Sequence, residues 1–351
     1  MSSEAMGRPT LESVARQAAV SRQTVSNVLN APHLVRPETL DRVRAVIDEL
    51  GYRPHRAART LRTRRSYLIA ARMHAPEDGI GGAVLDAFIH ALTLRAQERE
   101  YRVMLFAADD DQAEIAEYDQ LLGDHDLDAF VLTGTHLGDE RTAWLTGRGA
   151  AFVTFGRPWG ADDAGHAWVD VDGAAGTYDA TRHLVRRGHR RIAFLGWPEG
   201  SGVGDDRREG WRRACAEAGL ETADLTRAVL DSLPTGRAAG AELLDLPDPP
   251  TAIVCVSDSL ALGAWTEITA RGLTPGRDVS VVGFDDSPTA SVIGMSSVAQ
   301  PVDDVARVCI DQLEQLLAER AGPAGSAETG VPAYVPAPVL LPPSLVVRAS
   351  S

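Results

Sequence analysis

The sequence lacks lysine and long apolar runs, and its first residues lack the pattern of a signal peptide. All 35 of its Lys+Arg residues are arginine, which indicates genome composition more than mechanism. No apolar run approaches the roughly 18 residues that a membrane-spanning helix needs. The first residues, Met1-Ser2-Ser3-Glu4, do not show the basic and then apolar pattern of a signal peptide. We therefore expect a cytoplasmic protein without a membrane partner.

Cysteines are few, and nucleotide and hydrolase motifs are missing. Cys215, Cys255 and Cys309 lie far apart within apolar patterns and without metal-ligand spacing, so buried free thiols are predicted. No G-x-x-x-x-G-K or G-x-S-x-G is present. The stretch 202–207 begins like a dinucleotide fingerprint, but arginine stands where the third glycine belongs. We predict no cofactor.

Two acidic runs raise the question of catalysis or metal binding. One interpretation of Asp285-Asp286 is a catalytic carboxylate pair, but adjacent acids on one loop normally point apart, unlike the pair of a glycosidase. One interpretation of Asp109-Asp110-Asp111 is a metal site, but consecutive acids in a turn are more typical of a solvated face. We expect no catalytic residue, no metal and no enzyme activity.

Charge is divided unevenly along the chain. The net charge is −14, which is unfavourable for binding nucleic acid. Residues 1–65, however, contain twelve arginines and six acids, whereas the remainder contains 23 arginines and 43 acids. A basic head on an acidic body confines attraction for phosphate to one end of the protein.

Residues 10–51 have the pattern of three short helices. Thr10 can cap the first helix and Ser21 the second, with a tight turn at Ala19-Val20 between them. Pro37 begins a third helix that Gly51 ends. Apolar residues recur at helical spacing in all three: Leu11, Val14, Ala15, Ala18, Val25, Val28, Leu29, Leu40, Val43, Ile47 and Leu50. Three helices around one small core are typical of a helix-turn-helix unit.

The second helix has a polar face that could read DNA. Arg22, Gln23, Ser26 and Asn27 point away from its apolar stripe. Arginine can pair with guanine in the major groove, and Gln or Asn with adenine. For this helix taken alone, an ordinary solvated face is the simpler interpretation.

The next segment favours DNA. Residues 52–65 hold six arginines, with Ala57, Ala58 and Leu61 between them. We expect this segment to form a helix only when DNA neutralises its charge. Leucine is among the side chains that wedge between base steps in the minor groove.

These stretches together resemble the lac repressor/galactose repressor (LacI–GalR) family of bacterial regulators. The matching segments are Thr10-Leu11, Val14-Ala15, Val20-Ser21, Thr24-Val25-Ser26, Leu29-Asn30, Gly51-Tyr52-Arg53-Pro54 and Ala58-Arg59-Thr60-Leu61. The resemblance implies that Arg22, Gln23 and Asn27 read the major groove and that Ala58 and Leu61 lie on a hinge helix. The sequence departs from the family at His55, where Asn is usual, and at Asn27, where Arg is common. The predicted DNA-binding residues are Thr10, Ser21, Arg22, Gln23, Thr24, Ser26, Asn27, Asn30, Tyr52, His55, Arg56, Ala58, Arg59 and Leu61.

From residue 67 onward the pattern alternates between strands and helices. Strands are predicted at 67–73, 103–107, 128–133, 151–155, 191–196, 251–256, 279–283, 338–341 and 345–348. Helices are predicted at 82–99, 111–122, 173–188, 205–219, 258–271 and 301–320. Such alternation indicates parallel, doubly wound sheets, and the number of strands indicates two lobes.

This half also resembles the family and, through it, the periplasmic sugar-binding proteins. Shared motifs include 156–158, 170–173, 188–193, 207–211, 257–263, 281–286 and 300–301. We therefore expect a multidomain protein: an all-α helix-turn-helix headpiece and an α/β periplasmic-binding-protein-like effector domain of two doubly wound lobes. The predicted bounds are 1–51 for the headpiece, 52–65 for the hinge and 66–351 for ligand binding and dimerisation. The N-lobe is placed at about 66–158 plus 285–320, and the C-lobe at about 159–284 plus 321–351.

Ligands of open α/β sheets bind beyond the carboxyl ends of the strands. The loops there hold arginine, aspartate and large aromatics, which suit the hydroxyl rim and apolar face of a sugar. Arg207 and Asp285 match the family positions that hold sugar hydroxyls, and Ser257 is favoured over Asp258, which is expected to cap a helix. For the tryptophans, packing is the alternative interpretation. The predicted ligand-binding residues are His74, His136, Phe155, Trp159, Trp168, Trp197, Arg207, Ser257 and Asp285.

Together these features predict a homodimeric repressor of a near-palindromic double-stranded DNA operator. A sugar or oligosaccharide inducer would change the angle between the lobes and so disturb the hinge and its Leu61. A purine-like corepressor that tightens operator binding is the alternative within the class. A sugar-binding protein with no role at DNA is the alternative outside it.

Overall fold

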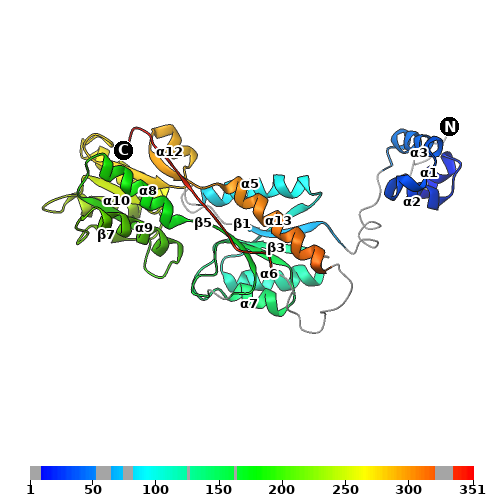
Figure 1. Cartoon of the computed structure of the whole chain (residues 1–351), viewed down its shortest axis with the longest axis horizontal. Helices are drawn as coiled ribbons and strands as arrows, with labels where there is room; N and C mark the ends of the chain where they lie inside the picture. The colour runs from blue at the N-terminus through cyan, green and yellow to red at the C-terminus, as the bar shows by residue number, and fades with distance from the viewer. Residues whose placement is uncertain (1–8, 53–64, 74–81, 125–126, 162–163, 321–334) are drawn as a thin grey trace, which may run out of the picture. The chain divides into compact units, whose positions relative to one another are not determined.

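The computed structural model describes residues 9–52, 65–73, 82–124, 127–161, 164–320 and 335–351 (Figure 1). The chain forms two compact units, Met1–Ser66 and Tyr67–Ser351. The predicted hinge contacts His55, Arg56, Ala58, Arg59 and Leu61, and the predicted ligand residue His74, lie outside the described residues.

The first unit is a small helical headpiece. It contains α1 (Leu11–Gln17), α2 (Arg22–Asn30), the 3-10 turn η1 (Pro32–Leu34) and α3 (Pro37–Leu50). Thr10 caps α1 through a reciprocal pair of hydrogen bonds with Ser13. Ser21 caps α2 by accepting from the Thr24 N–H at 3.0 Å. Gly51 ends α3 in the left-handed region, with φ 62°. The predicted caps, helix end and apolar stripes are confirmed, and the stripes meet in one core.

The first lobe of the second unit is built on a six-stranded parallel sheet. Its order is β11 (Val339–Leu341), β5 (Ala167–Val171), β4 (Phe152–Phe155), β3 (Ala129–Leu132), β1 (Leu68–Met73) and β2 (Arg102–Ala107). In Figure 1, α5 (Ala83–Glu98) and α13 (Val302–Arg320) cover one face, and α6 (Asp111–Asp124) and α7 (Glu140–Gly147) the other. Each face buries its own apolar core because side chains alternate along each strand.

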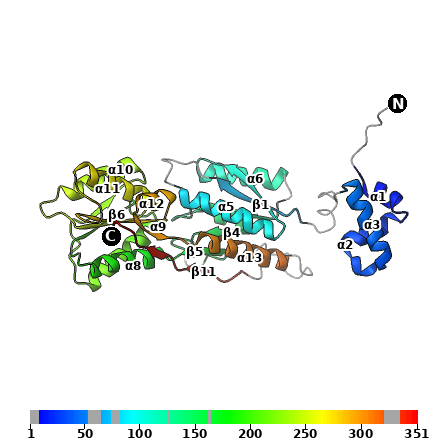
Figure 2. The same ribbon diagram turned by 90° about the horizontal axis from the view of Figure 1, so that it is seen from above.

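The second lobe repeats this plan. Its sheet has the order β12 (Ser344–Val346), β10 (Ser296–Ala299), β9 (Ser280–Phe284), β8 (Ala252–Cys255), β6 (Ile192–Gly196) and β7 (Thr226–Ala228). Only β12 runs antiparallel to its neighbour. The helices are α8 (Gly173–Arg186), α9 (Val203–Glu217), α10 (Leu233–Leu244), α11 (Asp258–Ala270) and the short α12 (Pro288–Ile293). Figure 2 shows α10 and α11 on one side of β6 and α8 on the other. The predicted fold class is confirmed.

The predicted lobe boundaries are wrong in three places. Strand β5, assigned to the C-lobe from sequence, pairs with β4 in the first sheet. Strand β10, assigned to the N-lobe, pairs with β9 in the second sheet. Strand β11 pairs with β5 rather than joining the second lobe. The chain therefore crosses between lobes after β5, after β10 and after β11. Sheet membership is decided by pairing partners far away in sequence, which strand patterns do not record.

The structure also bears on the cysteines and on membrane-spanning helices. Cys215, Cys255 and Cys309 are buried and free, as predicted, and burial raises the pKa of the Cys215 thiol to about 11. Within the described residues, no helix is both long and apolar enough to cross a membrane.

Candidate functional site

In the headpiece, α2 presents the polar face that the sequence predicted. Val25 and Val28 are buried in the headpiece core, whereas Arg22 and Gln23 are exposed at the beginning of the helix. The Gln23 Nε2 donates to Asn27 Oδ1 at 3.0 Å, so these two side chains are aligned along one face. An exposed face of Arg, Gln and Asn at a helix N-terminus can contact base edges.

Not all of the predicted headpiece contacts lie on that face. Tyr52 is 7% exposed and packs in the headpiece core, so its prediction as a DNA contact is corrected to a packing role. Thr24 bonds to the Ser21 hydroxyl at 2.9 Å, and Ser26 is partly buried. The side chain of Asn30 lies outside the described residues.

In the second unit, Arg207 of α9 is the centre of the candidate site. It is 6% exposed, and its Nη1 donates to the Val256 carbonyl at 2.6 Å. The guanidinium carbon lies 3.6 Å from the centroid of the Phe284 ring and 5.6 Å from that of Trp197. Burial lowers the pKa of Arg207, although nearby carboxylates, first among them Asp285, raise it. Arg207 is thus a buried cation held between aromatic rings.

Asp285 follows β9 and faces Arg207. Its Oδ1 lies 3.8 Å from Arg207 Nη1 and accepts from Gln300 Nε2 at 2.6 Å. Its φ of 110° is rare for a residue with a side chain, and strain of this kind concentrates at functional sites. Burial raises the pKa of this carboxyl to about 7, against the opposing effect of Arg207.

Several buried polar atoms around Arg207 have no hydrogen-bond partner within the described residues. They are Arg207 Nε, Trp159 Nε1, Trp197 Nε1 and Ser201 Oγ. The beginning of α9 brings three of these residues together: a Cβ at the N-cap Gly202 would lie 2.7 Å from the Trp159 ring, and one at Gly204 in the first turn would meet Ser201 and Trp197. Leaving a buried donor unpaired costs about 1–3 kcal/mol. A hydroxyl oxygen can accept a hydrogen bond from donors of this kind.

Arg157 joins the two lobes beside this group. Its Nε donates to Asp170 of β5 at 2.6 Å, and its Nη1 lies 3.4 Å from Asp206 of α9. Its guanidinium carbon stacks 4.6 Å from the Trp159 ring centroid. Burial raises the pKa of Asp206, although Arg157 lowers it. The site is therefore assembled from both lobes.

Known proteins give the site a context. The model of the lacI family of bacterial regulatory proteins matches residues 10–55, and that of the periplasmic binding protein-like domain matches 181–351. The HTH-type transcriptional regulator CelR of Thermobifida fusca is 34% identical over 316 residues, covering 87% of this chain and 92% of the relative. This chain belongs to the lacI family.

Further relatives agree over nearly the whole chain. The HTH-type transcriptional regulator RafR of Escherichia coli is 32% identical, covering 95% of this chain and 99% of the relative. A structure of a CelR–cellobiose complex is 30% identical with a TM-score of 0.71, covering 98% of this chain and all of that one. The lac repressor dimer bound to operator and the anti-inducer ONPF is 26% identical with a TM-score of 0.79, covering 98% and 99%. This lacI-family protein is thus a DNA-binding transcriptional regulator.

Within this lacI-family fold, some predicted ligand residues lie elsewhere. Phe155 is 8% exposed and packs on Phe88, with ring centroids 4.8 Å apart, so it is corrected to a core residue of the first lobe. Trp168 is the second residue of β5, further from the carboxyl edge than Asp170. It therefore does not join the group around Arg207.

The predictions for Ser257 and Asp258 are both corrected, because Ser257 rather than Asp258 caps the helix. Ser257 is the N-cap of α11 and donates its hydroxyl to Asp231. Asp258 does not cap α11; it accepts from the Ser287 N–H at 2.7 Å and from the Ser297 hydroxyl at 2.6 Å. Burial raises the pKa of Asp258 to about 6. Both side chains are buried and committed to protein partners, so neither is a strong candidate for contacting a ligand.

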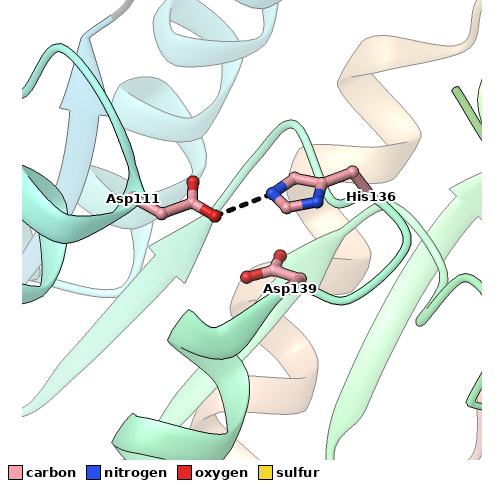
Figure 3. Close-up of side chains that lie close together, drawn as sticks. All are labelled: Asp111, His136 and Asp139. Atoms are coloured by element: carbon pink, nitrogen blue, oxygen red, sulfur yellow. Dashed lines mark hydrogen bonds and ion pairs between the residues drawn. The ribbon is translucent and has the colours of Figure 1, made fainter.

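His136 lies in a cluster that the sequence did not reveal. Figure 3 shows it beside Asp111 and Asp139, and the potential ligating atoms of the three lie within 4.8 Å of one another. Its Nε2 is 2.8 Å from Asp111 and its Nδ1 3.0 Å from the Leu137 carbonyl. Burial lowers the pKa of His136, but these hydrogen bonds raise it above its usual value. Arg141 Nη2 contacts Asp139 at 2.7 Å and its Nε lies 3.5 Å from Asp111, so a guanidinium already supplies positive charge there.

Four residues of the site were missed as contacts: Arg157, Asp170, Asp206 and Gln300. Three of them stand within motifs that carried the family resemblance, namely 156–158, 170–173 and 300–301. The charged and polar side chains of these residues were visible in the sequence. Their convergence on Arg207 depends on how the two lobes pack, and that packing could not be predicted from the sequence.

Proposed function

We propose that this regulator is a repressor that releases its operator when a neutral sugar binds between the lobes. The observation that carries this proposal is the group of four unpaired buried donors around Trp159, Trp197 and Arg207. Sugar hydroxyls can accept from each of them, while indole faces suit the apolar face of a pyranose ring. The similarity to CelR, of which a structure in complex with cellobiose is known, supports the same class of ligand.

Arg207 and Asp285 would fix the orientation of the sugar. A charged donor and a carboxylate acceptor, 3.8 Å apart, can share neighbouring hydroxyls of one ring. Both groups are already held, Arg207 by the Val256 carbonyl and Asp285 by Gln300. Little ordering is needed on binding, and such preorganisation increases affinity.

Control of DNA would follow from the two-lobe construction. A sugar that contacts both lobes binds more tightly to one relative arrangement of the lobes than to another. Only such a difference in affinity can shift the equilibrium between the two arrangements. We propose residues 1–51 as the headpiece that reads DNA and 52–65 as the hinge that responds to the changed arrangement of the lobes. A homodimer would place two headpieces on a near-palindromic operator. The regulator would act in the cytoplasm and release its effector chemically unchanged.

Calorimetry combined with operator binding tests this proposal. A duplex selected from a random library by the protein itself serves as operator, and cellobiose, lactose, maltose, melibiose, trehalose, glucose and galactose serve as ligands. We expect one or more sugars to bind and to lower operator affinity measured by fluorescence anisotropy. Tighter operator binding with sugar would instead indicate a corepressor, and no binding by any of these sugars would refute the proposal.

A matched pair of variants locates the site. Arg207→Ala should abolish the calorimetric signal, since it removes the buried cation. Arg208→Ala should preserve it, because that neighbouring arginine pairs with Glu199 and Asp205 near the surface. Equal loss of sugar binding in both variants would argue against a site at Arg207.

A further inference from the structure

The loop that follows β9 has a strained backbone. Asp285 and Asp286 have φ angles of 110° and 50°, positive values that residues with a side chain rarely adopt. Such conformations are unfavourable by themselves and persist only where surrounding contacts hold them. The Asp285 carboxylate nevertheless has a fixed place, because it accepts from Gln300 Nε2 at 2.6 Å and lies 3.8 Å from Arg207 Nη1. Other parts of the second lobe must therefore hold this loop.

Three successive backbone N–H groups of the loop are bound by other segments. The Asp285 N–H donates to a backbone carbonyl of β10 at 2.8 Å. The Asp286 N–H donates to the Ser297 hydroxyl at 2.9 Å. The Ser287 N–H donates to the Asp258 carboxylate at 2.7 Å. Two of the three acceptors are side-chain oxygens, so the conformation of the loop depends on side chains as well as on the sheet.

Asp258 supports both of these side-chain contacts. Its Oδ2 accepts from the Ser287 N–H, and its Oδ1 accepts from the Ser297 hydroxyl at 2.6 Å. The second bond fixes the proton of the Ser297 hydroxyl and so leaves the lone pairs of its oxygen free to accept from the Asp286 N–H. The two oxygens of one carboxylate thus hold two successive amides of the loop, one directly and one through a serine.

Asp258 is itself confined to one place. It is 2% exposed and lies in the first turn of α11. A Cβ at Gly283 of β9 would lie 2.1 Å from Asp258 Oδ1, so glycine at this position leaves the room that the carboxylate needs. A buried carboxylate is costly unless hydrogen bonds satisfy it. The loop provides such donors, and Asp258 and the loop therefore stabilise each other.

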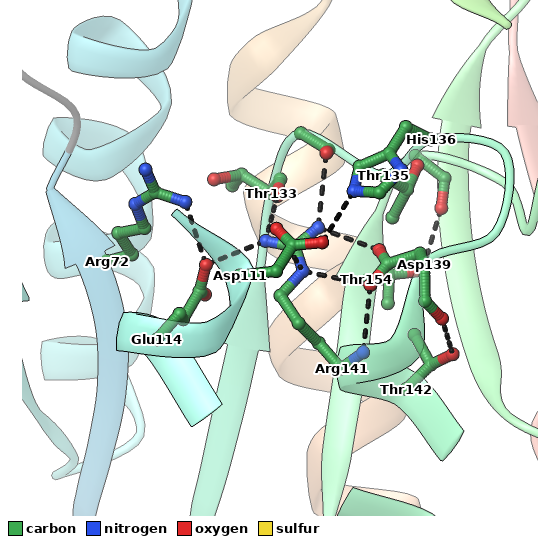
Figure 4. Close-up of polar contacts among 12 residues, drawn as sticks. Arg72, Asp111, Glu114, Thr133, Thr135, His136, Asp139, Arg141, Thr142 and Thr154 are labelled. Atoms are coloured by element: carbon green, nitrogen blue, oxygen red, sulfur yellow. Dashed lines mark hydrogen bonds and ion pairs between the residues drawn. The ribbon is translucent and has the colours of Figure 1, made fainter. Parts of the chain in front are cut away.

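The first lobe also holds a loop at the carboxyl edge of its sheet with a buried charged side chain. Figure 4 shows Arg141 of α7 at the centre of a polar network. Its guanidinium donates to the carbonyls of Thr133 and Gly134 at 3.2 and 3.1 Å. Both lobes thus use a buried charge at the beginning of a helix to bind backbone groups of a loop, and the loop held by Asp258 carries a carboxylate that faces Arg207.

We propose that Asp258 is a positioning residue for effector binding. It holds the strained loop in the conformation that turns the Asp285 carboxylate toward Arg207, and it acts on the sugar only through Asp285. This inference rests on the proposed function, because Arg207 and Asp285 are the groups that would orient the sugar. It adds a determinant of sugar affinity that contacts no sugar itself.

Asp258→Asn tests these hydrogen bonds with little change of shape. An amide has one acceptor oxygen, so asparagine can accept from the Ser287 N–H or from the Ser297 hydroxyl, but not from both. We expect amide exchange at residues 285–287 to become faster, and sugar binding measured by calorimetry to weaken roughly tenfold, within the range of coupling between contacting residues. The probes are cellobiose, lactose, maltose, melibiose, trehalose, glucose and galactose, and each comparison uses the one that the unsubstituted protein binds most tightly.

Asp278→Asn is the matched control in the same lobe. The Asp278 carboxylate also accepts from a backbone N–H, that of Thr274 at 2.7 Å, but it precedes β9 and so lies at the opposite end of that strand from Asp285. The control should bind the sugar as the unsubstituted protein does. Unchanged sugar affinity in Asp258→Asn, or an equal loss in both variants, would overturn the positioning role and leave the proposed function standing. Failure of every sugar to bind the unsubstituted protein would overturn both.

A double-mutant cycle separates action through Asp285 from a general loss of structure. In an Asp285→Ala background the loop no longer carries a carboxylate that could bind a sugar hydroxyl. Adding Asp258→Asn to that background should therefore weaken sugar binding by less than about twofold. Weak binding stays measurable because the sugars can be titrated at high concentration. A similar loss of sugar affinity from Asp258→Asn in both backgrounds would refute its action through Asp285.

Discussion

Replacing Arg141 by methionine should destabilise the first lobe strongly. Arg141 is 1% exposed, and its guanidinium makes five hydrogen bonds, to Glu114, to Asp139 twice, and to the carbonyls of Thr133 and Gly134. Methionine fills similar volume but donates to none of them. Removing one partner of a buried ion pair costs about 3–5 kcal/mol.

We expect the loss of stability to lie at the lower end of that range, because both acids keep other hydrogen-bond partners. Glu114 is also 1% exposed, but it keeps Arg72 at 2.9 Å and the Tyr118 hydroxyl as partners. Asp139 keeps the backbone N–H of residue 141 at 3.0 Å. We therefore expect a loss of about 3 kcal/mol, a large part of the 5–15 kcal/mol that is typical of a domain.

Urea unfolding followed by circular dichroism measures this loss. With a slope of about 1–3 kcal/mol per molar urea, the midpoint should fall by roughly 1–3 M. Arg148→Met is the matched control on the end of the same helix, because its pair with Asp119 is exposed and such pairs contribute about 0–1 kcal/mol. In the double variant Arg141→Met/Glu114→Gln the loss should be smaller than the sum of the single losses. The reasoning fails if Arg141→Met and Arg148→Met shift the midpoint equally, or if the double variant is additive.

Three further predictions concern the caps, the site and the reading helix. Thr10→Ala removes the capping box of α1 and should cost the headpiece about 0.5–2 kcal/mol, seen as faster amide exchange in α1 but not in the lobes. The raised pKa of Asp285, about 7, means that the folded protein keeps a proton between pH 4 and 7 that the unfolded chain has lost; this carboxyl's contribution to stability therefore falls as pH rises through that interval. Asp285→Asn should make the fall between pH 5 and 7 shallower in urea titrations, and an unchanged slope would contradict the raised pKa. Arg22→Ala or Gln23→Ala should lose roughly 1–3 kcal/mol of discrimination against single base changes in the operator, measured by anisotropy, whereas uniform weakening on all duplexes would indicate contact with phosphate alone.

The headpiece was the most predictable part of the fold because its determinants are local. A cap at Thr10 or Ser21 needs only the next three residues, and the stripe from Leu40 to Leu50 follows helical spacing. The stop at Gly51 depends on the tolerance of glycine for positive φ. Each of these features is encoded within one or two turns of helix.

Strand β10 shows why the lobes were harder to divide. Its sequence, Ser296-Ser297-Val298-Ala299, has no apolar run, although its first three residues are buried. The hydroxyl of Ser297 donates to Asp258, and that of Ser296 accepts from the Arg348 N–H at 2.8 Å. A buried serine becomes acceptable only when such partners arrive from elsewhere in the chain, so the strand was not predicted from sequence.

The types of side chain in the site could be predicted from the sequence, but only some of the residues that form it could be. Arg207 and Asp285 could be named because motifs marked them. Phe155 was misassigned because a strand end can face either a cleft or a core. His136 and Asp111 are 25 residues apart, and nothing in either local sequence indicates that they touch.

The three crossings between the lobes also bear on how this protein can evolve. Each lobe is made of segments that are interrupted along the chain by the other lobe, whereas the headpiece is one continuous segment. A single recombination event near residue 66 could give these lobes a new reading head. Exchange of one lobe for another would need three joints at once. The headpiece and the complete effector domain can therefore be exchanged as whole units in one step, whereas a new effector that keeps both lobes requires substitutions within the existing cleft.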